Sequence, residues 1–357
     1  MKTSVILGTR PEIIKMSPII RELQRRGLDF YVLHTGQHYS YNLDRVFFEQ
    51  LNLPKPKYNL EVGSGTQARQ TGKILKGVEK VLLKETQNIV LIQGDTNTVL
   101  GGALAAAKLH IKVGHVEAGL RSYDRRMPEE INRVVADHCS DYLFAPTNVS
   151  RDILLREGVP PNKIYVTGNT VVDALCQNLK LAERRTGILP ELDLEPGEFF
   201  LATLHRQENV DNHINLKSII KGLELISKHY NLPVVYPIHP RTRKAISELG
   251  LDPKLKIIDP QDYLSFLLLE KHAKLILTDS GGVQEEACIQ GVPCVTLREN
   301  TERPETVEAR ANLISGVKPE DILEKTETML KRKRNWQNPY GDGHSAEKII
   351  DIIFRSS

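Results

Sequence analysis

The chain has 357 residues, more than a single hydrophobic core usually serves, so two domains are expected. Its 48 basic and 45 acidic residues leave a formal net charge of +3, which argues against a nucleic-acid or membrane surface, and no segment has the roughly twenty apolar residues of a membrane span. The four cysteines form no C-x-x-C pair, so we expect small buried side chains in a reducing cytoplasm.

The first half of the chain alternates between short apolar runs and amphipathic stretches. Residues 3–7 predict a buried strand, and the following helix is expected to begin near Pro11 and to end before Gly27. Each apolar run ends in a polar loop, as expected for a parallel sheet. Further strands of this half are expected at residues 30–33, 88–92, 111–116, 142–145 and 164–167.

A helical and then Pro- and Glu-bearing stretch from Asp173 to about Gly197 is the predicted hinge. The alternation then restarts, with strands expected at residues 199–204, 233–237, 256–258, 274–277 and 292–297. We therefore predict an α/β fold of two facing Rossmann-like domains with the active site in the cleft between them. The predicted limits are residues 1–172, residues 173–340 and, for a C-terminal helix that packs back on the first domain, residues 341–357.

Residues 278–287 read TDSGGVQEEA and follow an apolar strand. Ser280, Gly281 and Gly282 are expected to place bare N–H groups at a helix N-terminus, where a phosphate can bind. One turn later, Glu286 could accept hydrogen bonds from two adjacent hydroxyls, such as those of a ribose. An ordinary strand-to-helix connection capped by Ser280 explains the pattern equally well, so the stretch alone leaves both interpretations open.

Acidic residues in the first half follow strands or begin helices. Asp95 and Glu117 each follow a predicted strand, and Glu129 and Glu130 follow Pro128. Carboxylates in a closed cleft have raised pKa values that suit acid–base chemistry. Asp95 is equally suited to cap a helix, and one of the two adjacent glutamates is expected only to favour the dipole of a helix start. Glu117 is harder to explain structurally, because burial of an unused carboxylate costs desolvation energy.

Cations follow the first strand of each half. His205 and Arg206 could neutralise a diphosphate leaving group, and Arg10 and Lys15 are their counterparts in the first half, although Lys15 would also fit a solvated helix face. The sequence has no G-x-G-x-x-G after the first strand, no G-x-x-x-x-G-K-[ST] and no His and Cys spacing of a metal site. Neither NAD, nor an ATP-driven step, nor a metal is therefore expected.

Eight motifs are distributed from the first strand to the last helix. They are GTRPEIIKM at residues 8–16, GDTNT at 94–98, HVEAGLR at 115–121, PEEINR at 128–133, TGNTVVDA at 167–174, LTDSGGVQEEA at 277–287, TERPE at 301–305 and NPYGDG at 338–343. In these motifs and in their order, the chain resembles the non-hydrolysing UDP-N-acetylglucosamine 2-epimerases. Where that family commonly has GHRRE, this chain has LHRQE at residues 204–208, a difference that can alter the loop around His205 without removing a catalytic residue.

The resemblance implies the GT-B-type architecture of nucleotide-sugar glycosyltransferases and the interconversion of UDP-GlcNAc and UDP-ManNAc. In this chemistry UDP leaves carbon 1 as a proton leaves carbon 2, a 2-acetamidoglucal forms, and both groups return with the opposite configuration at carbon 2. No cofactor is needed. The family also implies a homodimer and a role in polysaccharide biosynthesis.

Site roles follow from the resemblance residue by residue. Asp95, Glu117 and Glu129 are implied for acid–base chemistry, and His205 for assisting the leaving phosphate. Arg10 and Lys15 are implied to bind the diphosphate and sugar, and Gln261 and Phe266 the uracil. Ser280, Gly281 and Gly282 are implied to bind the diphosphate as well, and Glu286 the ribose. Arg303 is implied to close the site. A second, activating UDP-GlcNAc is implied to contact Gln37, His38, Arg69, Gln70 and Arg206.

Three other functions remain open at this stage. A glycosyltransferase of the same fold would share the UDP site but would not need three carboxylates as a set. A hydrolysing epimerase differs only in how long the glucal is held before water replaces UDP. A nucleotide-sugar binding module is disfavoured by the surplus of carboxylates.

Overall fold

The computed structural model describes residues 1–36, 41–185 and 187–355, and the chain forms two compact units. Unit 1 comprises Met1–Gln177 and Tyr340–Ser357, and unit 2 comprises Asn178–Pro339. The first boundary lies five residues beyond the expected domain limit, inside the predicted hinge of residues 173–197, and falls within the helix α7 (Thr170–Arg185). The second boundary lies between residues 339 and 340.

Unit 1 is built on a seven-stranded parallel sheet of order β3-β2-β1-β4-β5-β6-β7. Its strands are β1 (Thr3–Leu7), β2 (Phe30–His34), β3 (Tyr58–Asn59), β4 (Ile89–Gln93), β5 (Lys112–Val116), β6 (Tyr142–Ala145) and β7 (Ile164–Val166). The pattern predicts all of them except the two-residue β3, which is too short to leave an apolar signal.

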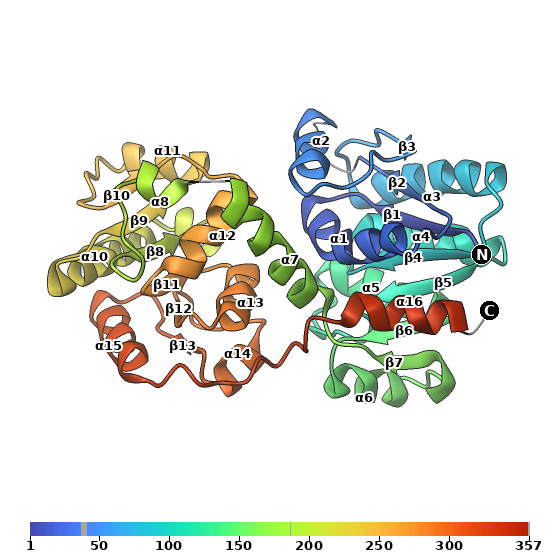
Figure 1. Cartoon of the computed structure of the whole chain (residues 1–357). Coiled ribbons are helices and arrows are strands. Elements are labelled where there is room, and N and C mark those ends of the chain that lie inside the picture. Colours follow the sequence, from blue (N-terminus) through green and yellow to red (C-terminus); the bar gives the residue numbers. More distant parts are fainter. Residues whose placement is uncertain (37–40, 186, 356–357) are drawn as a thin grey trace. The chain divides into compact units, whose positions relative to one another are not determined.

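Helices cover both faces of this sheet (Figure 1). Apolar side chains of α3 and α4 pack with alternate residues of β1, β2 and β4 in one core, while α1 and α16 contact each other on the opposite face. Arg26, the C-cap of α1, and Asp351 of α16 form an ion pair of 2.6 Å. The helices are α1 (Arg10–Arg25), α2 (Tyr41–Gln50), α3 (Gln67–Lys84), α4 (Asn97–Lys108), α5 (Pro128–Cys139), α6 (Asn148–Arg156), the 3₁₀ turn Pro161–Lys163, the first part of α7, and α16 (Ser345–Arg355).

Unit 2 repeats this arrangement on a six-stranded parallel sheet of order β10-β9-β8-β11-β12-β13. One face of the sheet packs against α10 and α15 in a continuous apolar core. On the other face, α12 and α13 lie next to each other (Figure 1). The strands are β8 (Phe200–Thr203), β9 (Val234–Pro237), β10 (Lys256–Ile258), β11 (Leu275–Thr278), β12 (Cys294–Thr296) and β13 (Asn312–Ile314), of which β13 was not expected. The helices are α8 (Ile188–Glu191), α9 (Gln207–Val210), α10 (His213–Tyr230), α11 (Pro240–Glu248), α12 (Tyr263–His272), α13 (Gly281–Gln290), α14 (Pro304–Glu308) and α15 (Pro319–Lys331).

The α/β class with two Rossmann-like parallel sheets is confirmed. In each sheet the strand order reverses at the first strand of the unit, between β1 and β4 in unit 1 and between β8 and β11 in unit 2. Ligands of doubly wound sheets bind outside the carboxyl ends of the strands at such a switch point. We therefore expect a ligand to bind at the loops after these four strands.

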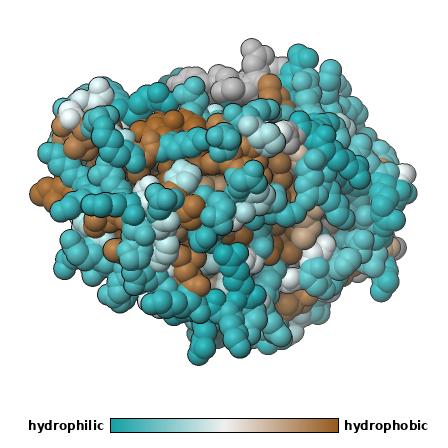
Figure 2. Space-filling view, turned by 60° about the vertical axis from the view of Figure 1, so that its left-hand side comes forward, coloured by the Kyte–Doolittle hydropathy of each residue, from teal (hydrophilic) through white to brown (hydrophobic). Residues whose placement is uncertain are grey.

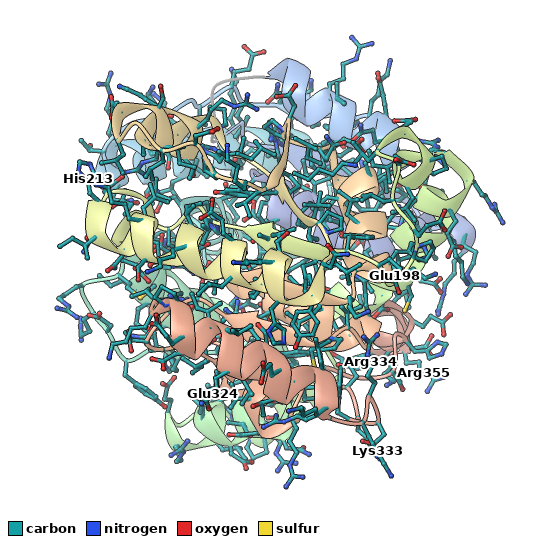
Figure 3. All side chains as sticks on the ribbon, turned by 90° about the vertical axis from the view of Figure 1, so that its left-hand side faces the viewer. Glu198, His213, Glu324, Lys333, Arg334 and Arg355 are labelled. Carbon is teal, nitrogen blue, oxygen red and sulfur yellow. The ribbon has the colours of Figure 1, made fainter. Side chains whose placement is uncertain are left out.

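The surface agrees with the balanced composition. Hydrophilic residues cover most of the face in Figure 2, with hydrophobic residues in separate patches, and charged side chains such as Glu324 and Lys333 point away from the ribbon in Figure 3. In the part of the chain that the structure describes, no helix is long and apolar enough to span a bilayer. The expectation of four buried cysteines is wrong for Cys176, which is exposed, and Cys139 is only half-buried.

Candidate active site

Glu117 is the most constrained acidic side chain after the strands of unit 1. It directly follows β5, its carboxylate is almost fully buried, and its backbone has a φ of +69°, which is unusual for a residue other than glycine. Lys15 Nζ on α1 donates to both carboxylate oxygens at 2.8 Å, and Gln93 Nε2 at the end of β4 donates to Oε2 at 2.5 Å. Lys15 therefore does not belong to a solvated helix face. Strained backbone held by surrounding contacts is common at functional sites.

Asp95 lies in the loop after β4, the strand next to β5. It does not cap a helix, because Thr96 is the N-cap of α4 and accepts a hydrogen bond from Val99 N–H. The carboxylate of Asp95 is about one-third exposed and pairs with the guanidinium of Arg133 on α5. Asp95 therefore keeps an accessible carboxylate whose position is fixed by a cation.

The two glutamates at the start of α5 have different environments. Glu130 is buried, and its carboxylate accepts hydrogen bonds from the backbone of Ser122 and Tyr123 at 2.9 and 3.0 Å. Burial alone would raise the pKa of Glu130, but these donors and Arg133 outweigh it, so the pKa is lowered. Glu130 thus holds the loop before α5, whereas Glu129 is half-buried and keeps its predicted role as a proposal.

The loop between β1 and α1 is closed by a carboxylate from the helix itself. Glu12 Oε2 accepts from Gly8 N–H and Thr9 N–H at 2.7 and 2.8 Å, and Thr96 donates to Oε1. Burial raises the pKa of Glu12 to about 7, against the effect of these donors. Arg10, by contrast, is exposed, and its guanidinium lies 5.3 Å from the ring centre of Phe47.

Of the residues implied for an activating site, Gln37 and His38 lie outside the described residues. Arg69 is exposed on α3, whereas Gln70 is buried and bonds to Gly63 O and Asn97 Nδ2 at 2.9 and 2.7 Å. Arg206 is in unit 2 and pairs with Glu302 at 3.4 Å. Gln70 is therefore engaged in local structure, and the contribution of all five residues to a second site remains a prediction.

In unit 2, the N-terminus of α13 offers backbone N–H donors that no group of the described residues uses. Ser280 is the N-cap, and its hydroxyl accepts from Val283 N–H at 3.5 Å. The N–H groups of Gly281 and Gly282 have no partner among the described residues, as is usual for the first turn of a helix. An anion can therefore bind here through the helix dipole and these two N–H groups.

Asp279 organises the neighbouring loop after β8. It is fully buried, and its carboxylate accepts from the backbone N–H groups of His205 and Arg206 at 3.0–3.1 Å and from Asn209 Nδ2 at 3.2 Å. His205 Nδ1 lies 3.0 Å from Oδ1 of the same carboxylate, and about half of the His205 side chain is exposed. In this pair Nδ1 carries the proton that faces Asp279, which leaves Nε2 as the ring nitrogen that can contact a ligand.

Glu286, the predicted ribose ligand, is half-buried on α13 and lies 3.5 Å from the hydroxyl of Tyr263. Behind it on α12 is Glu270, which is fully buried and accepts from Gln290 Nε2 at 3.0 Å. Burial and the neighbouring Glu286 carboxylate raise the pKa of Glu270 well above its ordinary value.

The remaining predicted residues of unit 2 lie around the same edge. Gln261 lies just before α12 and Phe266 lies in this helix, and both are half-buried. Gln261 Nε2 donates to Asp259 O at 2.8 Å. Arg303, just before α14, pairs with Glu285 of α13 at 2.8 Å, so this cation is fixed close to the start of the anion-binding helix.

Asp279, Gln93, Arg133 and Glu270 were not predicted as functional. Asp279 immediately precedes the SGG motif, and its position after β11, the neighbour of β8, would have indicated contact with the His205 loop. The other three offer no comparable signal, because an amide, a cation or a buried acid in a helix is usually structural. Among the described residues, no group of three or more His, Cys, Asp or Glu side chains could hold a metal ion.

Comparison with known proteins shows which family this chain resembles over its length. A family model described as UDP-N-acetylglucosamine 2-epimerase matches residues 21–354. A protein of that name from Methanocaldococcus jannaschii is 58% identical and covers 99% of both chains, and one from Methanococcus maripaludis is 56% identical and covers 99% of this chain and 98% of the relative. The crystal structure of the Methanocaldococcus jannaschii UDP-GlcNAc 2-epimerase in complex with UDP-GlcNAc and UDP has a TM-score of 0.87 at 58% identity, covering 99% of this chain and 100% of that one.

Proposed function

The chain belongs to the UDP-N-acetylglucosamine 2-epimerase family, and from this premise we propose that it interconverts UDP-GlcNAc and UDP-ManNAc without net hydrolysis. The observation that carries the proposal is the paired carboxylates of unit 1, Asp95 and Glu117, which follow adjacent strands and are each fixed by a cation. Inversion at carbon 2 requires proton transfer on both faces of that carbon, so two acid–base groups are needed.

In the proposed reaction, the bond between carbon 1 and the diphosphate oxygen breaks as carbon 2 loses its proton. The electron pair of the former C–H bond forms the double bond of 2-acetamidoglucal, and UDP leaves with the electron pair of the C–O bond. Protonation of carbon 2 on the opposite face and return of the diphosphate oxygen to carbon 1 complete the epimerisation. Asp95 and Glu117 exchange the protons, with Glu129 as the third member of the set.

Unit 2 supplies the binding of the leaving group in this scheme. The N–H groups of Gly281 and Gly282, which have no partner in the described part of the chain, and the dipole of α13 support a diphosphate site. His205 adds a proton donor for the charge that develops on the leaving oxygen. Glu286 accepts from the ribose hydroxyls, and Gln261 and Phe266 bind the uracil. Arg303 then neutralises the remaining phosphate charge. A homodimer in the cytoplasm is part of the same proposal and rests on the family resemblance.

Incubation with UDP-GlcNAc in deuterated water tests the function. We expect deuterium at carbon 2 of both nucleotide sugars without stoichiometric release of UDP. Free ManNAc with UDP would indicate the hydrolysing reaction, unchanged UDP-GlcNAc would refute the epimerase, and transfer of the sugar to an acceptor would indicate a glycosyltransferase.

Glu117→Gln is the sharpest variant for this assay. The amide cannot exchange the proton, so deuterium incorporation should fall by about 10²- to 10⁴-fold, the range typical of a lost acid–base group. UDP affinity should remain within about twofold, because in this scheme unit 2 binds UDP. Glu79→Gln, the same change on an exposed site of α3, is the matched control and should retain full activity. Loss of UDP binding in Glu117→Gln would instead assign this residue to the nucleotide.

A further inference from the structure

A buried polar chain lies beneath the two loops that carry Asp95 and Glu117. Its centre is His115 in β5, whose side chain is fully buried. Nδ1 lies 2.7 Å from Oδ1 of Asp137 on α5, and Nε2 lies 2.8 Å from the carbonyl oxygen of Gly94. The histidine therefore has an acceptor on each side and does not face a cavity for substrate.

These partners define the charge of the ring. A carbonyl oxygen can only accept, so Nε2 must carry a proton, and a carboxylate likewise requires a proton on Nδ1. Asp137 is held as a carboxylate because its Oδ2 also accepts from the Arg121 guanidinium at 2.7 Å and from Gly119 N–H at 3.2 Å. His115 with two N–H donors is an imidazolium.

The pKa values have the directions that this arrangement requires. Burial alone lowers the pKa of His115, but the Asp137 carboxylate and the Gly94 carbonyl outweigh burial and raise it. For Asp137, burial would raise the pKa, and the charges of His115 and Arg121 lower it instead. The charge of Arg121 is balanced in turn by Glu157 at 2.6 Å.

The chain of contacts joins the two loops at defined points. Gly94 immediately precedes Asp95, and it needs its positive φ of +84° to direct its carbonyl group and the next residue. Gly119 follows Glu117 by two residues, and Asp137 holds its N–H group. His115 itself lies in β5 and precedes Glu117, the first residue after that strand, by two residues. A shift of the ring would therefore move both loops relative to each other.

We propose that His115 is a positioning residue whose imidazolium ties the Gly94 carbonyl to Asp137 and thereby sets the spacing of the carboxylates of Asp95 and Glu117. The inference rests on the proposed function of these two carboxylates. His115 does not touch the substrate. It keeps two proton-transfer groups in register with the two faces of one carbon atom.

Two conservative variants separate the two hydrogen bonds. In His115→Gln the amide nitrogen takes the place of Nε2 and can still donate to Gly94, whereas in His115→Asn it takes the place of Nδ1 and can still donate to Asp137. His115→Gln therefore loses the hydrogen bond to Asp137, and His115→Asn loses the hydrogen bond to Gly94. We expect kcat for UDP-GlcNAc to fall by about 10- to 100-fold in both, the loss typical of reacting groups displaced by about 1 Å. KM and the Kd for UDP should change by less than about threefold, since neither reports the spacing of the carboxylates.

His213→Gln is the matched control, because this histidine is exposed at the start of α10 and lies at the edge of unit 2 in Figure 3. It should keep wild-type kcat. Folded His115 variants with wild-type kcat would refute the inference and leave His115 with a role in stability alone. A parallel loss of UDP affinity would refute it as well.

The charge of His115 is measured in the wild-type protein and does not depend on activity or on the folding of a variant. ¹⁵N-edited NMR at pH 7.5 should show both ring nitrogens of His115 protonated. A neutral ring would overturn the inference. Wild-type protein without epimerase activity but with a charged His115 would refute the proposed function while leaving the buried imidazolium established, so the two failures are distinguishable.

Discussion

Asp279→Asn tests whether the buried carboxylate behind His205 matters for chemistry or only for folding. The wild-type carboxylate accepts from two backbone N–H groups, from the Asn209 amide and from His205 Nδ1. With the amide oxygen in the place of Oδ2, the bonds to Arg206 N–H and Asn209 survive. The amide NH₂ group then faces His205 Nδ1 and cannot accept its proton.

The expected magnitude follows from this single lost acceptor. A hydrogen bond to a charged group contributes about 1.5–3 kcal/mol, so the free energy of unfolding should fall by roughly that amount. His205 must also turn its unprotonated nitrogen towards the amide, so Nδ1 no longer donates to a carboxylate. If the contact between His205 and Asp279 assists the leaving diphosphate, the same energy appears in the barrier, and kcat should fall by about 10- to 150-fold.

The assay combines urea unfolding with kcat, KM and the Kd for UDP. Asp252→Asn is the control, because it makes the same chemical change at an exposed aspartate of unit 2. It should alter neither the free energy of unfolding nor kcat. A folded Asp279→Asn protein with wild-type kcat would refute the argument that Asp279 acts through His205. Equal loss in Asp279→Asn and in a His205→Gln, Asp279→Asn double variant would support it, since residues that act as a unit are not additive.

Two further predictions concern buried acids. Burial and the neighbouring Glu286 carboxylate raise the pKa of Glu270 in the folded state, so the stability that this acid contributes is present below about pH 4.3 and is lost as the pH rises towards its folded-state pKa. Relative to Glu270→Gln, the free energy of unfolding of the wild type in urea should fall by up to about 1.4 kcal/mol per pH unit as the pH rises above about 4.3. Parallel curves for the two proteins would contradict a protonated Glu270. Asp173 is buried and accepts from Ala346 N–H at 2.9 Å at the start of α16, so Asp173→Ala should lower the free energy of unfolding by about 1–3 kcal/mol and Asp173→Asn by less, whereas equal losses would show that the acceptor oxygen is unimportant.

The sequence predicts most of the architecture because buried parallel strands are continuous apolar runs. Eleven of the strands follow from such runs, whereas β3 and β13 are short edge strands of two and three residues whose sequences carry no clear signal. The expected hinge begins with a helical part, and the boundary between the units falls there, because α7 continues through it as one regular helix. A helix can connect two units without Pro or Gly, so the Pro- and Glu-bearing residues that follow do not mark the boundary.

For the candidate site, sequence identifies the loops but not the partners within them. Lys15 and Glu117 are 102 residues apart, and His205 and Asp279 are 74 residues apart, so their contacts depend on strand order and side-chain direction. The two glutamates after Pro128 cannot be ranked from sequence, because only the fold shows that the loop at residues 122–123 returns to Glu130.

The two units also differ in a way that assigns the anion site to one of them. In unit 1, the N–H groups at the end of β1 are occupied by Glu12, and in unit 2 those after β8 are occupied by Asp279. A phosphate at either loop would have to displace a buried carboxylate and would meet its negative charge. The start of α13 is different, since Gly281 and Gly282 present N–H groups that no described residue uses and Arg303 is fixed nearby. The SGG motif is therefore the place in these loops where a diphosphate gains hydrogen bonds without first breaking those of the protein.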